Sequence, residues 1–139
     1  MTPIDFKPTE QTQTAHIHIV DGIIHVTYLK DAEITVEVKK EHHRFYKEIT
    51  VFGPMPMLLK MEDGVSITRD ARVYSRKIED KQPFTATAVL VNNLAYKILA
   101  NFYANFYRPK KPFKVFDNEE KAIQWLQQFK NETKHPESE

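Results

Sequence analysis

The sequence lacks cysteine altogether and holds only three glycines among its 139 residues. The absence of cysteine excludes disulfides, thiol catalysis and cysteine-ligated metal. With so little glycine there is no GxGxxG or GxxxxGK[ST] motif, which excludes the nucleotide-binding loops of those kinds. No stretch approaches the ~18–20 apolar residues of a membrane span, and the N-terminus does not have the pattern of a signal peptide. We therefore expect a cytoplasmic protein with no membrane span and no cofactor.

The chain also lacks an excess of charge of either sign. The 20 Lys and Arg residues nearly balance the 19 Asp and Glu residues, so the net charge is +1. Nucleic-acid binding normally needs a broad basic surface, and we expect no nucleic-acid partner. Hydrophobic residues make up 41% of the chain, which is ordinary for a globular domain.

The chain is long enough for one domain and has polar ends. We expect a flexible N-terminal lead over residues 1–14, one folded domain over residues 15–130 and a flexible C-terminal tail over residues 131–139. Two alternating runs surround Asp21-Gly22, which is a strong hairpin signal. Further strands are expected at 57–61, 84–91 and 113–116.

Four helices are expected between and after these strands. Their predicted N-caps are Thr35, Thr68, Asn93 and Asp117. The resulting order is β-β-α-β-α-β-α-β-α, in which strands alternate with helices. The sequence therefore predicts an α/β fold with a small mixed, mainly parallel sheet of about five strands, an N-terminal hairpin and four helices.

Several segments resemble the STAS-like (anti-sigma-factor-antagonist-like) domains, and within them a small bacterial group of uncharacterised proteins. The segments are Asp21-Gly22-Ile23-Ile24-His25-Val26, Asp63-Gly64-Val65-Ser66-Ile67-Thr68, Ala88-Val89-Leu90-Val91-Asn92-Asn93, Arg108-Pro109-Lys110-Lys111-Pro112-Phe113 and Phe116-Asp117-Asn118-Glu119-Glu120. The likeness spans about residues 15–130. It implies a STAS-like architecture and a non-enzymatic regulatory or ligand-binding module that acts through protein partners or self-association, as a homodimer for example.

The loop before the second helix is a candidate switch. STAS regulators that act as phosphoswitches carry an Asp-Ser-(Ser/Thr)-Gly-like motif there, whereas this chain has Asp63, Ser66 and Thr68 at a different spacing. The simpler interpretation makes Thr68 an N-cap and Ser66 a turn residue. Because open α/β sheets bind ligands beyond the carboxyl ends of their strands, the same loop with Asn92 and Asn93 is also a candidate ligand site.

Three histidines are candidate metal ligands. If Asp21-Gly22 is a two-residue turn, His18 pairs with His25, and His16 lies on the same face of the sheet. Cross-strand neighbours are close enough to share a metal ion, which would allow a small metal-dependent enzyme. The alternative is a solvated face that is rich in histidine.

The helix expected at residues 94–107 is apolar over more of its surface than one sheet contact needs. At 100° per residue, one arc is assigned to the core and consists of Ala95, Ile98, Leu99, Phe102 and Phe106. A second stripe contains Tyr96, Tyr103 and Tyr107. This stripe is a candidate interface or ligand-pocket surface, or else it packs on the neighbouring helices.

A short basic loop follows that helix. Arg108, Lys110 and Lys111 are candidates for binding a small anionic ligand. The alternative is a solvated loop that its prolines keep stiff.

Overall fold

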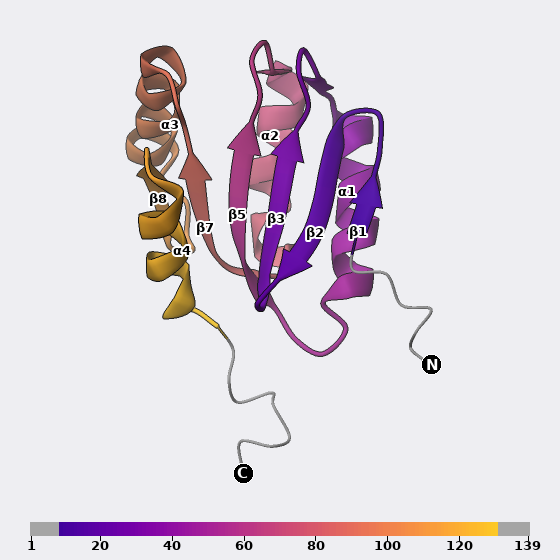
Figure 1. Ribbon diagram of the computed structural model, residues 1–139. Coiled ribbons are helices and arrows are strands. Elements are labelled where there is room, and N and C mark those ends of the chain that lie inside the picture. Colours follow the sequence, from indigo (N-terminus) through magenta and orange to yellow (C-terminus); the bar gives the residue numbers. More distant parts are fainter. Residues whose placement is uncertain (1–8, 131–139) are drawn as a thin grey trace.

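A six-stranded sheet forms the centre of the molecule, with helices on both of its faces (Figure 1). In the computed structural model, which describes residues 9–130, the strands in spatial order are β1 (Thr9–Gln11), β2 (Ala15–Val20), β3 (Ile23–Tyr28), β5 (Met55–Met61), β7 (Phe84–Leu90) and β8 (Phe113–Phe116). The pairs β1–β2 and β2–β3 are antiparallel, and the remaining three pairs are parallel. The predicted mixed sheet, its N-terminal hairpin and the four helices are confirmed.

The hairpin turns at the predicted dipeptide. Asp21 and Gly22 have φ angles of 52° and 76°, and positive φ at both central residues is the requirement of a type I′ turn. This turn sets the register in which His18 lies opposite His25, as predicted.

Each helix begins at a side-chain cap. The helices are α1 (Val36–Ile49), α2 (Arg69–Lys77), α3 (Leu94–Tyr107) and α4 (Glu119–Gln127), and a short 3-10 turn, η2 (Glu79–Lys81), follows α2. Thr35, Thr68 and Asn93 cap the first three helices as predicted, each accepting a hydrogen bond from a backbone N–H of the first turn. The fourth cap is Asn118 rather than Asp117.

Alternation along the strands divides the core into two parts. Helices α1 and α2 lie behind the sheet in Figure 1, and α4 lies in front of it. On β5, Met57 belongs to the cluster beneath α1 and α2, whereas Leu58 belongs to the cluster beneath α4. We call these two sides the α1 face and the α4 face.

Three short strands escaped prediction. β1 lies inside the segment expected to be a flexible lead, and β4 (Glu33–Ile34) pairs with β6 (Ser66–Ile67) in a separate two-stranded parallel sheet. Strands of two or three residues are too short to show a period of two, so backbone pairing alone defines them. The rest of the predicted lead that precedes β1, residues 1–8, and the whole predicted tail, residues 131–139, lie outside the described residues.

Helix α3 has its predicted bounds, but the arc that was assigned to the core is largely exposed. Ile98, Leu99 and Phe102, which belong to that arc, are 56–61% exposed. Tyr96 and Ala100, from the other stripe, are half-buried instead. The helix has two apolar stripes, and periodicity by itself cannot tell which of them faces the protein.

Candidate functional site

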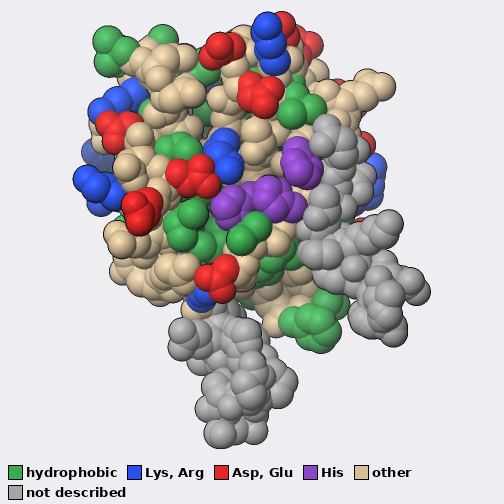
Figure 2. All heavy atoms as spheres, viewed as in Figure 1, with side chains coloured by type: hydrophobic (Ala, Val, Ile, Leu, Met, Phe, Trp, Pro, Cys, Tyr) green, Lys and Arg blue, Asp and Glu red, His purple; other side chains and the backbone are tan. Residues whose placement is uncertain are grey.

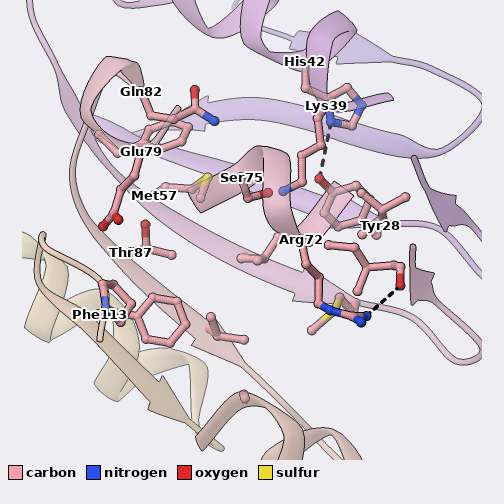
Figure 3. A pocket seen from close by; sticks show the side chains of 18 of the residues that line it. Tyr28, Lys39, His42, Met57, Arg72, Ser75, Glu79, Gln82, Thr87 and Phe113 are labelled. Carbon is pink, nitrogen blue, oxygen red and sulfur yellow. Dashed lines mark hydrogen bonds between the residues drawn. The ribbon is translucent and has the colours of Figure 1, made fainter. Parts of the chain in front are cut away.

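A cavity of about 730 Å³ lies between the α1 face of the sheet and helices α1, α2 and α3 (Figure 3). Small-molecule sites in proteins typically have volumes of about 300–1,000 Å³. The sheet contributes alternate residues of its central strands, among them Met57 and Leu59 of β5 and Val89 of β7. From α3 the lining includes Tyr96, Leu99, Ala100 and Phe102.

The cavity exists because α3 does not pack closely against the strands beneath it. The helix contacts β8, and near its N-terminal end the Tyr96 hydroxyl donates a hydrogen bond to the carbonyl of Val65 at 3.2 Å. Tyr96 therefore reaches the segment before β6, on the far side of the cavity. Because apolar cavities normally cost stability in a protein core, a space of this size lined by apolar side chains is the strongest candidate for a binding site.

One end of the cavity carries polar groups from two helices. In Figure 3 the Lys39 and His42 side chains of α1 and the Ser75 side chain of α2 extend into it. The Oγ of Ser75 and the Nε2 of His42 are both buried and have no hydrogen-bond partner among the described residues. The Nδ1 of His42 lies 3.5 Å from the Tyr28 hydroxyl, at the outer limit of a hydrogen bond.

Burial shifts the ionisation of these groups. It lowers the pKa of Lys39 to about 8. Burial, together with the nearby charge of Lys39, lowers the pKa of His42 to about 4. It also raises the pKa values of Tyr28 and Tyr46. At neutral pH this end of the cavity therefore holds one cation, Lys39, among neutral side chains, which suits an anionic ligand group.

The predicted basic loop forms part of the cavity wall. Lys111 lines the cavity, and its ammonium donates to the carbonyl of Gln82 at 2.6 Å. The ammonium of Lys110 lies 3.1 Å from the carboxylate of Asp80. Arg108 is exposed and has a left-handed backbone, with φ at 51°. Two of the three charges thus attach the loop to the η2 region, and the loop's role as an anion site stays a prediction.

In the predicted switch loop and the asparagine pair, the side chains of Thr68 and Asn93 cap the N-termini of helices. Thr68 accepts a hydrogen bond from the N–H of Ala71, and Asn93 accepts one from Tyr96. Asp63 is exposed, and its carbonyl accepts from the N–H of Asp31.

Ser66 lies in β6, rather than in a turn, and it lines the cavity. Asn92 is exposed. Of these five predicted residues, Ser66 is the one that belongs to the cavity lining.

Of the predicted tyrosine stripe, Tyr96 lines the cavity. The side chains of Tyr103 and Tyr107 lie outside the described residues.

The three predicted histidines come together on the α4 face. The rings of His16 and His18 stack with centroids 4.9 Å apart, and those of His18 and His25 stack at 5.1 Å. Figure 2 shows histidine side chains gathered in a compact patch on this side of the molecule. Burial, followed by the charge of Lys60, lowers the pKa of His25 to about 4. Within residues 9–130 no group of three or more His, Cys, Asp and Glu side chains could hold a metal ion, so the geometry does not favour the metal-dependent alternative.

Sequence reasoning missed the polar end of the cavity. Lys39 and His42 are three residues apart and so share one side of α1. A lysine beside an apolar helix stripe usually extends its ammonium to solvent. The sequence therefore does not reveal a lysine that points inward. Ser75 gave no signal at all, since a serine within a helix has no special spacing.

Residues 17–130 match the sequence profile of a family described as a domain of unknown function, DUF7793. The match covers most of the chain. The chain belongs to the DUF7793 family. No curated protein matches this DUF7793 chain significantly.

One solved structure supports the fold. It is the crystal structure of an uncharacterised protein of the DUF3478 family, with a SpoIIAA-like fold, from Shewanella loihica PV-4. The two chains share 14% sequence identity over 81% of this chain and 91% of that chain, with a TM-score of 0.57. The DUF7793 chain therefore has a SpoIIAA-like fold, as the resemblance to STAS-like domains predicted.

The helices of this DUF7793 domain are unsuited to crossing a bilayer: within residues 9–130, none combines the necessary length with sufficient apolar character.

Proposed function

We propose that this domain is a regulatory ligand-binding module that holds a small, mainly apolar molecule in the cavity between its sheet and α3. The observation that carries the proposal is the cavity of about 730 Å³, whose lining surface is mostly apolar and also contains several polar side chains. Such a composition is typical of small-molecule sites, in which a few polar groups orient a ligand that is held mostly by apolar contact.

The arrangement of polar groups favours binding over catalysis. A serine nucleophile needs a base within hydrogen-bond reach, and the Oγ of Ser75 has no such partner among the described residues. The His42 ring is close to Tyr28, but the phenol is neutral over the physiological range because burial raises its pKa. These groups can orient a ligand without forming a reactive pair.

Binding of the neutral fluorescent probe N-phenyl-1-naphthylamine tests the proposal. Ala100 of α3 lines the cavity, so Ala100→Phe fills part of the space. Ala95 is exposed on the same helix, and Ala95→Phe is therefore the matched control. We expect the wild type and A95F to bind the probe with equal affinity and A100F to bind about tenfold more weakly, a difference of about 1.4 kcal/mol.

Two outcomes would overturn the proposal. The first is a wild-type protein that does not bind the probe at all. The second is equal binding by A100F and A95F, which would locate the probe elsewhere. Thermal unfolding of both variants shows whether A100F keeps its fold, so that a loss of binding can be assigned to the filled cavity.

Association with a second copy or a different protein is the other part of the sequence-based prediction. The exposed apolar side chains of α3 that do not line the cavity, Leu94 and Ile98, direct this prediction to the outer side of that helix. Native mass spectrometry of the untagged protein tests it. A dimer mass that disappears in Ile98→Ser supports association through α3, and a monomer at all concentrations contradicts it.

A further inference from the structure

We infer that the ligand of this cavity is a carboxylic acid with an apolar body, and that its carboxylate pairs with the ammonium of Lys39. The inference rests on the proposed function and adds the chemical class of the ligand. Its basis is the position of three polar groups at one end of a cavity that is otherwise largely apolar.

Lys39 is a cation without a countercharge. It lines the cavity, and among residues 9–130 no carboxylate forms an ion pair with it. A charge taken out of water is costly unless it is paired and hydrogen-bonded, so buried lysines normally have an acidic partner. In this cavity a ligand is the group that can supply the partner.

Two further polar atoms near Lys39 lack partners. The Oγ of Ser75 and the Nε2 of His42 are buried without a hydrogen bond among the described residues. When the Tyr28 hydroxyl donates to Nδ1 of His42, Nε2 carries the ring proton and becomes a donor. The ammonium of Lys39 and the hydroxyl of Ser75 extend into the same end of the cavity in Figure 3, and both can donate to the two oxygens of one carboxylate, which accept but cannot donate when ionised.

The acidic side chain that lines the cavity is already occupied. Glu79 accepts hydrogen bonds from the backbone N–H groups of Lys110 and Lys111, at 2.7 and 3.4 Å. Its carboxylate is thus directed to the basic loop rather than to Lys39. The countercharge for Lys39 is left to the ligand.

The cavity lining contains two other cations, and one of them, Lys111, already donates its ammonium to the carbonyl of Gln82 at 2.6 Å. The rival to Lys39 is therefore Arg72. Its guanidinium lines the cavity but donates to the carbonyl of Ile67 at 3.2 Å, and the residue is exposed. An exposed cation keeps its hydration and gains little from an ion pair. Lys39 is half-buried and gains more from a ligand carboxylate, and this difference can be tested directly.

The apolar part of the lining fits the remainder of such a ligand. Met57 and Leu59 of β5, Val89 of β7 and Phe113 of β8 line the cavity on the side of the sheet. Leu99 and Ala100 line it from α3. An alkyl chain or aromatic body that extends from Lys39 over these strands would lie mainly against apolar side chains.

The experiment compares two probes with the same alkyl chain, decanoic acid and decanol, by calorimetry at pH 7. We expect the wild type to bind decanoate about tenfold more tightly than decanol or better, which is the size of one charge-assisted hydrogen bond. Lys39→Met should remove this preference while keeping the affinity for decanol. Lys47→Met is the matched control, because Lys47 is an exposed lysine of the same helix, and it should behave as the wild type.

The outcomes separate the inference from the proposed function. Equal binding of decanoate and decanol by the wild type would overturn the inference and leave the binding module intact. Binding of neither probe, together with failure to bind N-phenyl-1-naphthylamine, would overturn both. Loss of the preference in Arg72→Met rather than in Lys39→Met would move the carboxylate to Arg72 and contradict the role of Lys39.

Proton uptake gives an independent readout. Burial lowers the pKa of Lys39 to about 8 without ligand, and a bound carboxylate would raise it again. Decanoate binding at pH 8.5–9 should therefore take up about half a proton or more in the wild type, whereas decanol binding should take up none. Calorimetry in two buffers of different ionisation enthalpy measures this uptake. Its absence in the wild type would contradict the ion pair.

Discussion

The two faces of the sheet are covered in different ways, and strand β7 takes part in both. On the α4 face, Ala122 and Leu126 of α4 are completely buried against Ala86 and Ala88 of the strand. On the α1 face, Val89 of the same strand lines a cavity of about 730 Å³ beneath α3. The same strand is thus the base of a filled core on one side and the floor of a binding site on the other.

Side-chain size explains the closeness of α4. Two alanines on β7 meet an alanine on the helix, so that the helix backbone approaches the sheet and the larger Leu58 and Leu126 fill the remaining space. Helix α3 has large apolar residues, yet Leu99 is 61% exposed and Phe102 56% exposed. The comparison teaches that a helix rich in apolar residues can still be poorly packed, and that function is better sought where packing is incomplete.

Matched leucine truncations should show the largest difference between the two faces. Leu126→Ala removes a completely buried side chain from the α4 face and should lower the free energy of unfolding by about 2–5 kcal/mol. Leu99→Ala makes the same change in α3, where the side chain is mostly exposed, and should cost less than about 1 kcal/mol. Urea denaturation followed by circular dichroism measures both values.

The outcome that would contradict this comparison is a similar cost for the two leucines. It would mean that α3 is packed as tightly in solution as α4, and that the cavity is closed. The slope of the transition should be the same in all three proteins, because a change in slope would indicate a change in the unfolded state.

The charge inside the cavity should give the next largest effect. Burial lowers the pKa of Lys39 from 10.5 to about 8, so the folded protein binds this proton less strongly than the unfolded chain. The cost is complete below pH 8, and it decreases as the pH rises toward 10.5. Because part of the side chain is still accessible to water, we expect Lys39→Met to stabilise the protein by about 1–3 kcal/mol at pH 7 and by less at pH 10.

Urea denaturation at the two pH values checks this, with Lys47→Met as the control. Lys47 is exposed, and its replacement should change stability by no more than about 0.5 kcal/mol at either pH. A loss of stability in Lys39→Met at pH 7 would show that the ammonium has a partner in the ligand-free protein. It would also weaken the case for an acidic ligand.

Local signals predicted most of the fold. The Asp21-Gly22 turn specified the hairpin and its register, and Thr35, Thr68 and Asn93 marked the starts of three helices. These features depend on a few neighbouring residues, so a single sequence contains them. The pairing of β4 with β6 joins segments about thirty residues apart by backbone hydrogen bonds, and no side-chain pattern predicts this pairing.

The candidate site was less predictable for a physical reason. Whether Tyr96 or Ile98 faces inward depends on how α3 rests on the sheet, and both residues lie on apolar stripes. Lys39 and Ser75 come together only through the packing of α1 on the sheet beside α2. A cavity is a property of such packing, and its polar lining does not follow from spacing along one helix.

The smallest effect should come from the hydrogen bond that ties α3 across the cavity. Tyr96→Phe removes the bond from the Tyr96 hydroxyl to the carbonyl of Val65 and should lower the free energy of unfolding by about 0.5–1.5 kcal/mol. Because α4 has no part in this bond, hydrogen exchange should accelerate in the amides of α3 and stay unchanged in α4. Tyr74→Phe is the control, since Tyr74 is half-buried on α2 and its hydroxyl makes no hydrogen bond among the described residues. If exchange accelerated equally in α3 and α4, the helix would open only with the whole domain, and entry of a ligand would require global unfolding rather than a local movement of α3.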